Sequence, residues 1–212
     1  MYQLPLFPLN TVLFPGIPIV LHIFEERYKA MINQCVSERK PFGVVLIEEG
    51  VAEYGPANPY QIGCTADIVQ VERLDDGRMN IVAIGQNRFR ILTTDNEKPY
   101  LQGTVEDTPI NEDKSAATLS RLASELRILL ESYVEALHRL SDIQVNWDQL
   151  PDEPVELAYL AAYVLQVPSE QKQEMLTQND ASKLLRSLIA SFRTEVSLIS
   201  NIVETGTIFS LN

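Results

Sequence analysis

Residues 4–31 read LPLFPLNTVLFPGIPIVLHIFEERYKAM, and this stretch decides the first part of the fold. Two apolar runs flank Pro15-Gly16, a dipeptide typical of turns in which glycine takes the positive φ angle. Apolar residues then recur with a period of two through residues 17–23, which predicts a strand. After Phe24 the period becomes helical, and the predicted buried stripe is Tyr28, Met31, Ile32 and Cys35. The stretch therefore predicts a strand, a turn, a second strand and a helix.

The β pattern continues to residue 105, with further strands predicted at 42–47, 61–73, 79–84, 89–92 and 100–105. A change of phase at Ile68-Val69 predicts a β-bulge, Asp75-Asp76-Gly77 predicts a hairpin turn, and residues 85–87 are expected to turn again. Because proline has no N–H to donate, Pro5 and Pro8 predict an edge or poorly paired strand. Six or seven strands with one inserted helix are expected to close into a small barrel or sandwich.

The second half of the chain has a helical period. After an acidic linker at residues 106–114, helices are predicted from 115 to 140, from 155 to 167, from 169 to 178 and from 179 onward. The predicted domains are residues 1–110 and 111–212. A leucine stripe spans Leu126–Leu140 and has two interpretations: packing inside a helical bundle, which we expect, or the seam of a homodimer.

Several motifs together resemble the N-terminal (LON) domain of Lon proteases and its stand-alone relatives. They are PLFPL at 5–9, VLFPG at 12–16, FEERY at 24–28, YQIGCTA at 60–66, DDGR at 75–78 and GQNRFRI at 85–91. The resemblance covers about the first 105 residues specifically and the helical half less specifically. It implies an α+β chain with a PUA-like β pseudo-barrel, one inserted helix and a C-terminal helical bundle. It also implies recognition of substrates or partners for degradation machinery.

Composition narrows the functional classes. The formal net charge is −12, which disfavours nucleic acid because phosphate binding needs clustered Lys and Arg. No signal peptide or transmembrane run is visible, and two cysteines without a CxxC motif fit a reducing compartment, so we expect a cytoplasmic protein with no membrane partner.

No catalytic motif stands out. The chain holds no Gly-Lys dipeptide, so a phosphate-binding Walker A loop is absent, and the Ser-Lys dyad of Lon peptidases belongs to a separate domain that we do not expect here. His22 and Glu25 are too few to hold a metal, and Cys35 and Cys64 are expected to be core residues. We therefore expect no enzyme activity, no cofactor and no metal, while a hydrolase site assembled from distant residues is a further alternative.

Apolar and aromatic residues gather near two loops, and this is the candidate site. The residues are Phe14, Pro15, Ile17, Tyr54, Pro56 and Tyr60. Exposed apolar groups mark binding surfaces, so we expect this set to bind unfolded or partner polypeptides, with a protease or ATPase acting in trans. The alternative is that the set caps the open end of the barrel. The alternative function is an RNA- or small-ligand-binding PUA-like module.

Overall fold

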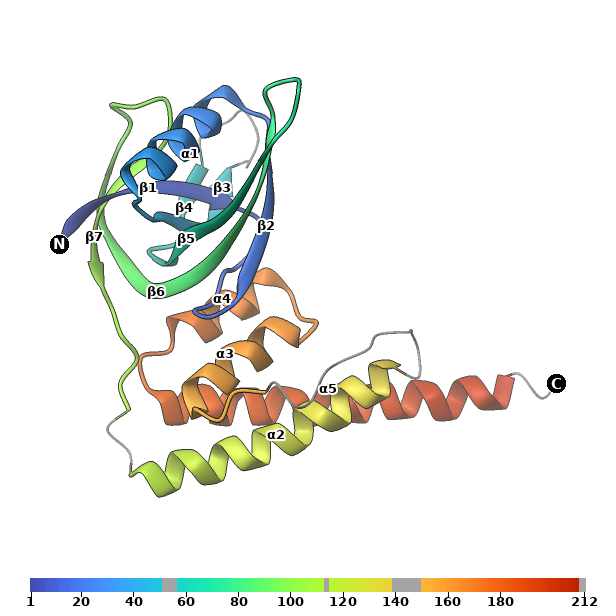
Figure 1. Cartoon of the computed structure of the whole chain (residues 1–212). Coiled ribbons are helices and arrows are strands. Elements are labelled where there is room, and N and C mark those ends of the chain that lie inside the picture. The colour runs from blue at the N-terminus through green and yellow to red at the C-terminus, as the bar shows by residue number, and fades with distance from the viewer. Residues whose placement is uncertain (51–56, 113–114, 139–149, 210–212) are drawn as a thin grey trace. The chain divides into compact units, whose positions relative to one another are not determined.

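The computed structural model describes residues 1–50, 57–112, 115–138 and 150–209 and has a mixed α+β fold (Figure 1). It divides into two compact units. One comprises Met1–Pro109 with Gln166–Thr177, and the other comprises Ile110–Leu165 with Gln178–Asn212. This division differs from the two consecutive domains expected, because residues 166–177 return to the first unit. There the Gln173 Nε2 of helix α4 (Ser169–Thr177) donates to the carbonyl of Ile62 at 2.8 Å.

The first unit is built on one seven-stranded sheet (Figure 1). The strands are β1 (Tyr2–Leu9), β2 (Pro18–Ile23), β3 (Phe42–Gly50), β4 (Ala57–Pro59), β5 (Ile62–Arg73), β6 (Met79–Asp95) and β7 (Gln102–Asp107). The order is β1-β7-β6-β5-β3-β4, β2 pairs with β6, and β1 also pairs with β3. This last pairing closes a ring of strands. Its interior holds a core cluster of Leu4, Leu6, Val45, Phe89 and Val105.

The expectation that residues 4–9 form an edge or poorly paired strand is wrong. Tyr2–Pro5 pairs antiparallel with β7, and Leu6–Leu9 pairs parallel with β3. Pro5 and Pro8 are tolerated because each half of β1 forms its ladder mainly on one side. A missing N–H can therefore face the side without a ladder.

Strand β6 is continuous through residues 85–87, so the turn expected there is also wrong. Gly85 explains the difference, because an added Cβ would lie only 2.2 Å from the carbonyl oxygen of Phe14. Glycine here lets the strand pass directly beneath the turn at Pro15-Gly16. The predicted bulge is confirmed by a register shift between Ile68 and Gln70. The predicted hairpin turn is confirmed by Gly77 at φ +80° between β5 and β6.

Helix α1 (Glu26–Glu38) buries the predicted stripe of Tyr28, Met31, Ile32 and Cys35. It ends at Arg39, which has the left-handed backbone angles φ 52° and ψ 46° and whose N–H bonds back to the last turn. The chain then enters β3 through Lys40 and Pro41. This places the C-terminal end of α1 beside the start of β1, where the larger of two cavities discussed below is found.

The second unit is helical, with α2 (Ala116–His138), α3 (Pro154–Val164) and α5 (Ala181–Phe209). Helices α2 and α5 pack against each other and bury Leu126, Tyr133, Leu184, Leu188 and Phe192, whereas Leu129 and Leu137 of the predicted stripe are half-buried and Leu140 lies outside the described residues. The rings of Tyr133 and Phe192 meet edge to face with centroids 5.1 Å apart. This packing within one chain accounts for the buried members of the α2 stripe, and the homodimer seam stays an untested alternative. None of the described helices is long and apolar enough to cross a membrane.

Candidate functional site

The predicted site residues do not form one exposed surface. Phe14 is 0% exposed and Ile17 is 6% exposed, so the expectation that both are accessible is wrong. Pro15 and Tyr60 are half-buried, whereas Tyr54 and Pro56 lie outside the described residues. For Phe14 and Ile17 the alternative of a capping role fits the burial. Binding of a polypeptide by the other members of the set stays a prediction.

The turn at Pro15-Gly16 explains this burial. Gly16 has φ +78°, as predicted, and the N–H of Ile17 bonds to the carbonyl of Phe14 at 3.2 Å. The turn is also attached to β6, because Gly16 N donates to Gly85 O at 2.9 Å and Gly85 N donates to Ile17 O at 3.0 Å. These bonds hold Phe14 and Ile17 against β6.

Strand β2, which follows this turn, has an unpaired edge. Among the described strands it pairs only with β6, from Pro18 opposite Ile84 to Ile23 opposite Met79. Gly85 N donates to Ile17 O, and in an antiparallel pair the backbone N–H and C=O groups of alternate residues point toward the partner strand. The backbone groups of the odd-numbered residues of β2 therefore point toward β6. The backbone groups of Val20 and His22 therefore face away from β6. The Val20 side chain is 73% exposed.

A cavity of about 120 Å³ borders residues 21–23 at the end of β2. We call it the β1–β2 cleft, and it is lined by Phe7, Pro8, Leu9, Leu21, His22, Ile23, Phe24, Glu25 and Tyr28. The Phe7 and Tyr28 rings stack at 4.0 Å and make an aromatic wall, and Phe24 at the rim is 37% exposed. Residues 7–9 of β1 and residues 21–23 of β2 thus border one apolar hollow, although β1 and β2 are not neighbours in the sheet.

Charged groups at the cleft are engaged with each other. The buried carboxylate of Glu25 accepts a hydrogen bond from Arg27 Nε at 2.9 Å, and the Arg27 guanidinium lies 4.5 Å from the Tyr28 ring centroid. Burial raises the pKa of Tyr28, so its hydroxyl stays neutral at physiological pH. The cleft therefore offers an apolar, largely neutral interior.

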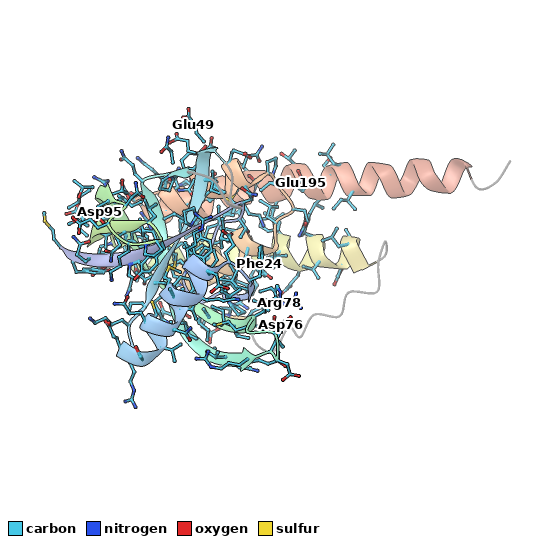
Figure 2. The ribbon with its side chains drawn as sticks, turned by 90° about the horizontal axis from the view of Figure 1, so that it is seen from above. Phe24, Glu49, Asp76, Arg78, Asp95 and Glu195 are labelled. Carbon is cyan, nitrogen blue, oxygen red and sulfur yellow. The ribbon has the colours of Figure 1, made fainter. Side chains whose placement is uncertain are left out.

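The polar groups of the neighbouring β5–β6 hairpin also pair locally. His22 Nδ1 lies 2.7 Å from Asn80 Oδ1, and Asn80 Nδ2 donates to Glu72 at 2.9 Å. At the hairpin turn Asp76 and Arg78 form an ion pair, which lowers the pKa of Asp76 (Figure 2). The polar side chains beside β2 are therefore held in hydrogen bonds and an ion pair with each other.

No reactive constellation is found in the described part of the chain. It contains no group of three or more His, Cys, Asp or Glu residues placed to hold a metal. Burial raises the pKa of Cys35 to about 11 and that of Cys64 to about 12, and both thiols are buried. A nucleophilic cysteine needs a lowered pKa, so the environment of both thiols fits core packing.

Sequence reasoning missed the residues of the β1–β2 cleft. The period of two in residues 17–23 does signal β2, but it does not say which strand pairs with it. Phe24 carried a signal of its own as an aromatic residue between a predicted strand and a predicted helix. Its neighbours across the cleft, Phe7 to Leu9, come from a strand whose partners only the fold reveals.

A closed ring of strands carrying one helix, together with a helical unit, defines a mixed α+β protein with a small apolar cleft. Comparison with known families identifies its class. The chain belongs to the family described as the ATP-dependent protease La (LON) substrate-binding domain, whose model matches residues 3–191. The resemblance found in the sequence motifs is thereby confirmed.

Similar proteins include a Lon protease from Anaeromyxobacter dehalogenans, 29% identical over 211 residues, which cover 96% of this chain and 25% of that protein. Lon protease 2 from Myxococcus xanthus is 28% identical over 208 residues, with 96% and 25% covered. This chain thus spans about a quarter of the length of these curated relatives.

Solved structures show the same fold. The crystal structure of a Lon N-terminal domain protein from Xanthomonas campestris has a TM-score of 0.64 and 26% identity, covering 90% of this chain and 98% of that one. The N-terminal domain of a Mycobacterium avium complex Lon protease has a TM-score of 0.71 and 20% identity, covering 91% and 98%.

Proposed function

We propose that this chain is a non-catalytic module that binds extended, apolar segments of non-native polypeptides at the β1–β2 cleft. The observation that carries the proposal is an unpaired strand edge whose last residues border an apolar hollow. We also propose that the closed ring of strands is a PUA-like pseudo-barrel. The family description of a substrate-binding domain supports the class of ligand.

Binding proceeds by strand addition. A peptide in extended conformation hydrogen-bonds to the outward backbone groups of Val20 and His22 and continues the sheet beyond β2. Because successive side chains of a strand point to opposite faces, every second peptide side chain is directed toward the cleft. Its apolar wall, including Phe7 and Tyr28, holds one aliphatic or aromatic side chain at a time.

Affinity from these contacts is modest. Each backbone hydrogen bond contributes about 1 kcal/mol net, and burying one Leu or Phe side chain contributes about 2 kcal/mol. After the cost of immobilising an extended chain, we expect a Kd on the order of 10–100 μM for a single site. Weak binding of this kind suits the transient capture of many different sequences.

Charge favours a subset of these sequences. The chain carries a net charge of −12, while the exposed Glu26 carboxylate beside the cleft is already paired with Lys29 at 2.8 Å. Basic residues flanking an apolar segment are therefore attracted, and acidic ones are repelled. We expect affinity for apolar segments flanked by Lys or Arg to fall as salt is added.

Prolines keep the two borders of the cleft from pairing with other copies of this chain. Pro18 occupies an even-numbered position of β2, where an N–H would face away from β6. In β1, Leu6 N donates to Leu101 O at 2.9 Å, so the alternation turns the nitrogen of Pro8 away from β3. Each border therefore lacks one backbone N–H donor, which disfavours edge-to-edge pairing with another copy. The remaining outward backbone groups, such as those of Val20 and His22, can still bond to a peptide.

Fluorescence anisotropy tests the proposal, with a labelled, permanently unfolded polypeptide titrated with this protein. A folded protein of equal charge serves as the negative control. We expect saturable binding of the unfolded chain alone. No binding up to about 100 μM, weaker than roughly −5.5 kcal/mol, would contradict the proposed function.

Two variants locate the site. Phe24→Asp is expected to weaken binding about tenfold, because it places a charge on the apolar rim. Leu92→Asp is the matched control, since Leu92 is 39% exposed against 37% for Phe24 and lies outside the cleft. Val20→Pro removes an outward N–H without removing a β2–β6 bond and is also expected to weaken binding. Equal losses for Phe24→Asp and Leu92→Asp would place the site elsewhere.

The wider role is part of the same proposal. We place the module in cytoplasmic protein quality control, presenting polypeptides to a protease or ATPase that acts in trans. This role is supported by the similarity of the chain to about a quarter of the length of each Lon protease. Co-purification of an ATP-dependent protease with the wild-type chain, reduced by Phe24→Asp, is the expected result.

A further inference from the structure

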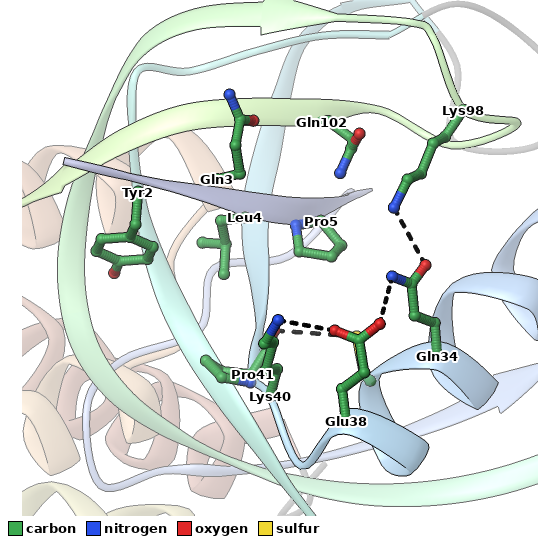
Figure 3. A pocket seen from close by; sticks show the side chains of 11 residues that line it. Tyr2, Gln3, Leu4, Pro5, Gln34, Glu38, Lys40, Pro41, Lys98 and Gln102 are labelled. Carbon is green, nitrogen blue, oxygen red and sulfur yellow. Dashed lines mark hydrogen bonds and ion pairs between the residues drawn. The ribbon is translucent and has the colours of Figure 1, made fainter.

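A second and larger cavity of about 480 Å³ lies at the other end of β1 (Figure 3). We call it the Lys98 pocket. It is bordered by the start of β1, the end of α1 and the segment before β7, all within the first unit. Its lining residues are Tyr2, Gln3, Leu4, Pro5, Gln34, Cys35, Glu38, Lys40, Pro41, Lys98 and Gln102.

Part of the pocket lining is apolar. Leu4 and Cys35 are buried, and Pro5 and Pro41 stand half-buried beside them. Burial raises the pKa of Cys35 to about 11, so its thiol is neutral at physiological pH. The hydroxyl of Tyr2 donates to Asp107 at 2.8 Å and ties the Tyr2 ring to β7. The apolar part of a small ligand can therefore pack against neutral side chains and against the Tyr2 ring, which the hydrogen bond to Asp107 holds in place.

A chain of hydrogen bonds runs along the part of the rim formed by Lys98, the end of α1 and Lys40 (Figure 3). Lys98 Nζ donates to Gln34 Oε1 at 3.2 Å, and Gln34 Nε2 donates to Glu38 Oε1 at 2.7 Å. Lys40 Nζ lies 2.8 Å from the other oxygen of Glu38. The Tyr100 hydroxyl donates to Gln34 Oε1 at 2.7 Å and so fixes the orientation of this amide.

The charges on this rim do not balance. Hydrogen bonds from Lys40 and Gln34 lower the pKa of Glu38, so this carboxylate is ionised and already engaged at both oxygens. Among the described residues no carboxylate lies within ion-pair distance of Lys98, whose Nζ sits 5.5 Å from the Tyr100 ring centroid. The pocket lining thus holds two ammonium groups and one carboxylate, and Lys98 attracts Glu38 only at longer range and makes no ion pair among the described residues.

We propose that the Lys98 pocket binds a small carboxylic acid with an apolar body. The carboxylate accepts hydrogen bonds from Lys98, and the body lies against Leu4, Pro5 and Pro41. The volume falls within the roughly 300–1,000 Å³ of small-molecule sites, which are mostly apolar with few polar groups. An amine is disfavoured because the lining already holds two ammonium groups, Lys40 and Lys98, against the single carboxylate of Glu38.

This site is separate from the β1–β2 cleft. The cleft borders Phe7–Leu9 of β1, whereas the pocket borders Tyr2–Pro5. The inference therefore stands or falls independently of polypeptide binding. It assigns the small-ligand alternative to a specific place in the first unit.

The test is an NMR titration of the ¹⁵N-labelled full chain with sodium octanoate, 1-octanol and octylamine. We expect octanoate to shift the amide signals of Leu4, Gln34, Cys35 and Gln102 and to bind at least about fivefold more tightly than octanol. Octylamine is expected to bind more weakly than either. Equal affinity for octanoate and octanol, or shifts confined to other residues, would overturn the proposal.

Variants test the role of the charge. Lys98→Met is expected to weaken octanoate binding about fivefold and to leave octanol binding unchanged. Lys183→Met in α5 changes the net charge equally and is expected to have no effect. The comparison of octanoate with octanol on the wild-type protein answers the same question if Lys98→Met does not fold. Binding of a short apolar peptide through its free C-terminus, without binding of octanoate, would overturn the assignment of a small acid.

Discussion

Replacing Gly85 by alanine tests the attachment of the Pro15-Gly16 turn to β6. A Cβ at Gly85 would lie 2.2 Å from the carbonyl oxygen and 3.0 Å from the carbonyl carbon of Phe14, and 3.1 Å from Cys64 Sγ. Backbone atoms cannot rotate away as a side chain can. The turn must therefore move by about 1 Å to restore an ordinary van der Waals contact.

The cost follows from what this movement breaks. Two hydrogen bonds flank the clash, Gly16 N to Gly85 O at 2.9 Å and Gly85 N to Ile17 O at 3.0 Å. Each costs about 1 kcal/mol when lost, and more when a partner stays buried. Repacking the buried Phe14 adds about 1–2 kcal/mol, while the stiffer unfolded chain returns about 0.5 kcal/mol. We expect Gly85→Ala to lower the free energy of unfolding by about 3 kcal/mol in total.

Urea unfolding followed by circular dichroism measures this loss. With an m-value of about 1.5 kcal/mol/M, the midpoint is expected to fall by about 2 M. Gly16→Ala is the matched control, because a Cβ at Gly16 meets nothing within 4 Å. Its φ of +78° costs about 1 kcal/mol for alanine. If Gly85→Ala is no more destabilising than Gly16→Ala, the argument from close backbone approach is wrong.

Three further outcomes are expected. Phe14→Asp places an unpaired charge in the core and is expected to lower the free energy of unfolding by more than about 4 kcal/mol. Pro15 is half-buried, so Pro15→Asp is expected to change the melting temperature by only a few degrees. Thermal melts followed by circular dichroism compare the two variants. Burial raises the pKa of Cys35 from 9.0 to about 11, so the folded chain holds less thiolate at pH 8 than the unfolded chain does. Alkylation of Cys35 by iodoacetamide at pH 8, followed by mass spectrometry, is therefore expected to be about 100-fold slower in the folded chain. Gln173→Leu removes the 2.8 Å bond to Ile62, costs about 1 kcal/mol and should speed amide hydrogen exchange in α4; unchanged exchange would contradict that role.

Local features of the fold were predictable from the sequence because they depend on neighbouring residues. The Pro15-Gly16 turn, the bulge after Ile68 and the hairpin turn at Gly77 follow from backbone preferences of a few residues. The buried stripe of α1 follows from the helical period of its apolar residues, which the sequence shows directly. The motifs that resemble the LON family also lie in these local segments.

Burial at the candidate site was less predictable. Phe14 and Pro15 are neighbours of similar apolar character in a turn, yet only Phe14 is fully buried. The difference arises because β6 passes beneath the turn, and it does so at Gly85, some 70 residues later in the sequence. Turn chemistry alone contains no information about what lies under the turn.

The sequence by itself determined the strand–turn–strand–helix opening, the helical second half, the acidic charge and the family resemblance. Only the tertiary structure decided that β1 pairs on both sides, that β6 is continuous, and that β2 keeps a free edge beside Phe7 and Phe24. It also brought Lys98 within 3.2 Å of Gln34, although 64 positions separate them. The physical reason is that periodicity specifies which face of an element is apolar, whereas strand partners and pocket walls depend on contacts between residues far apart in the chain.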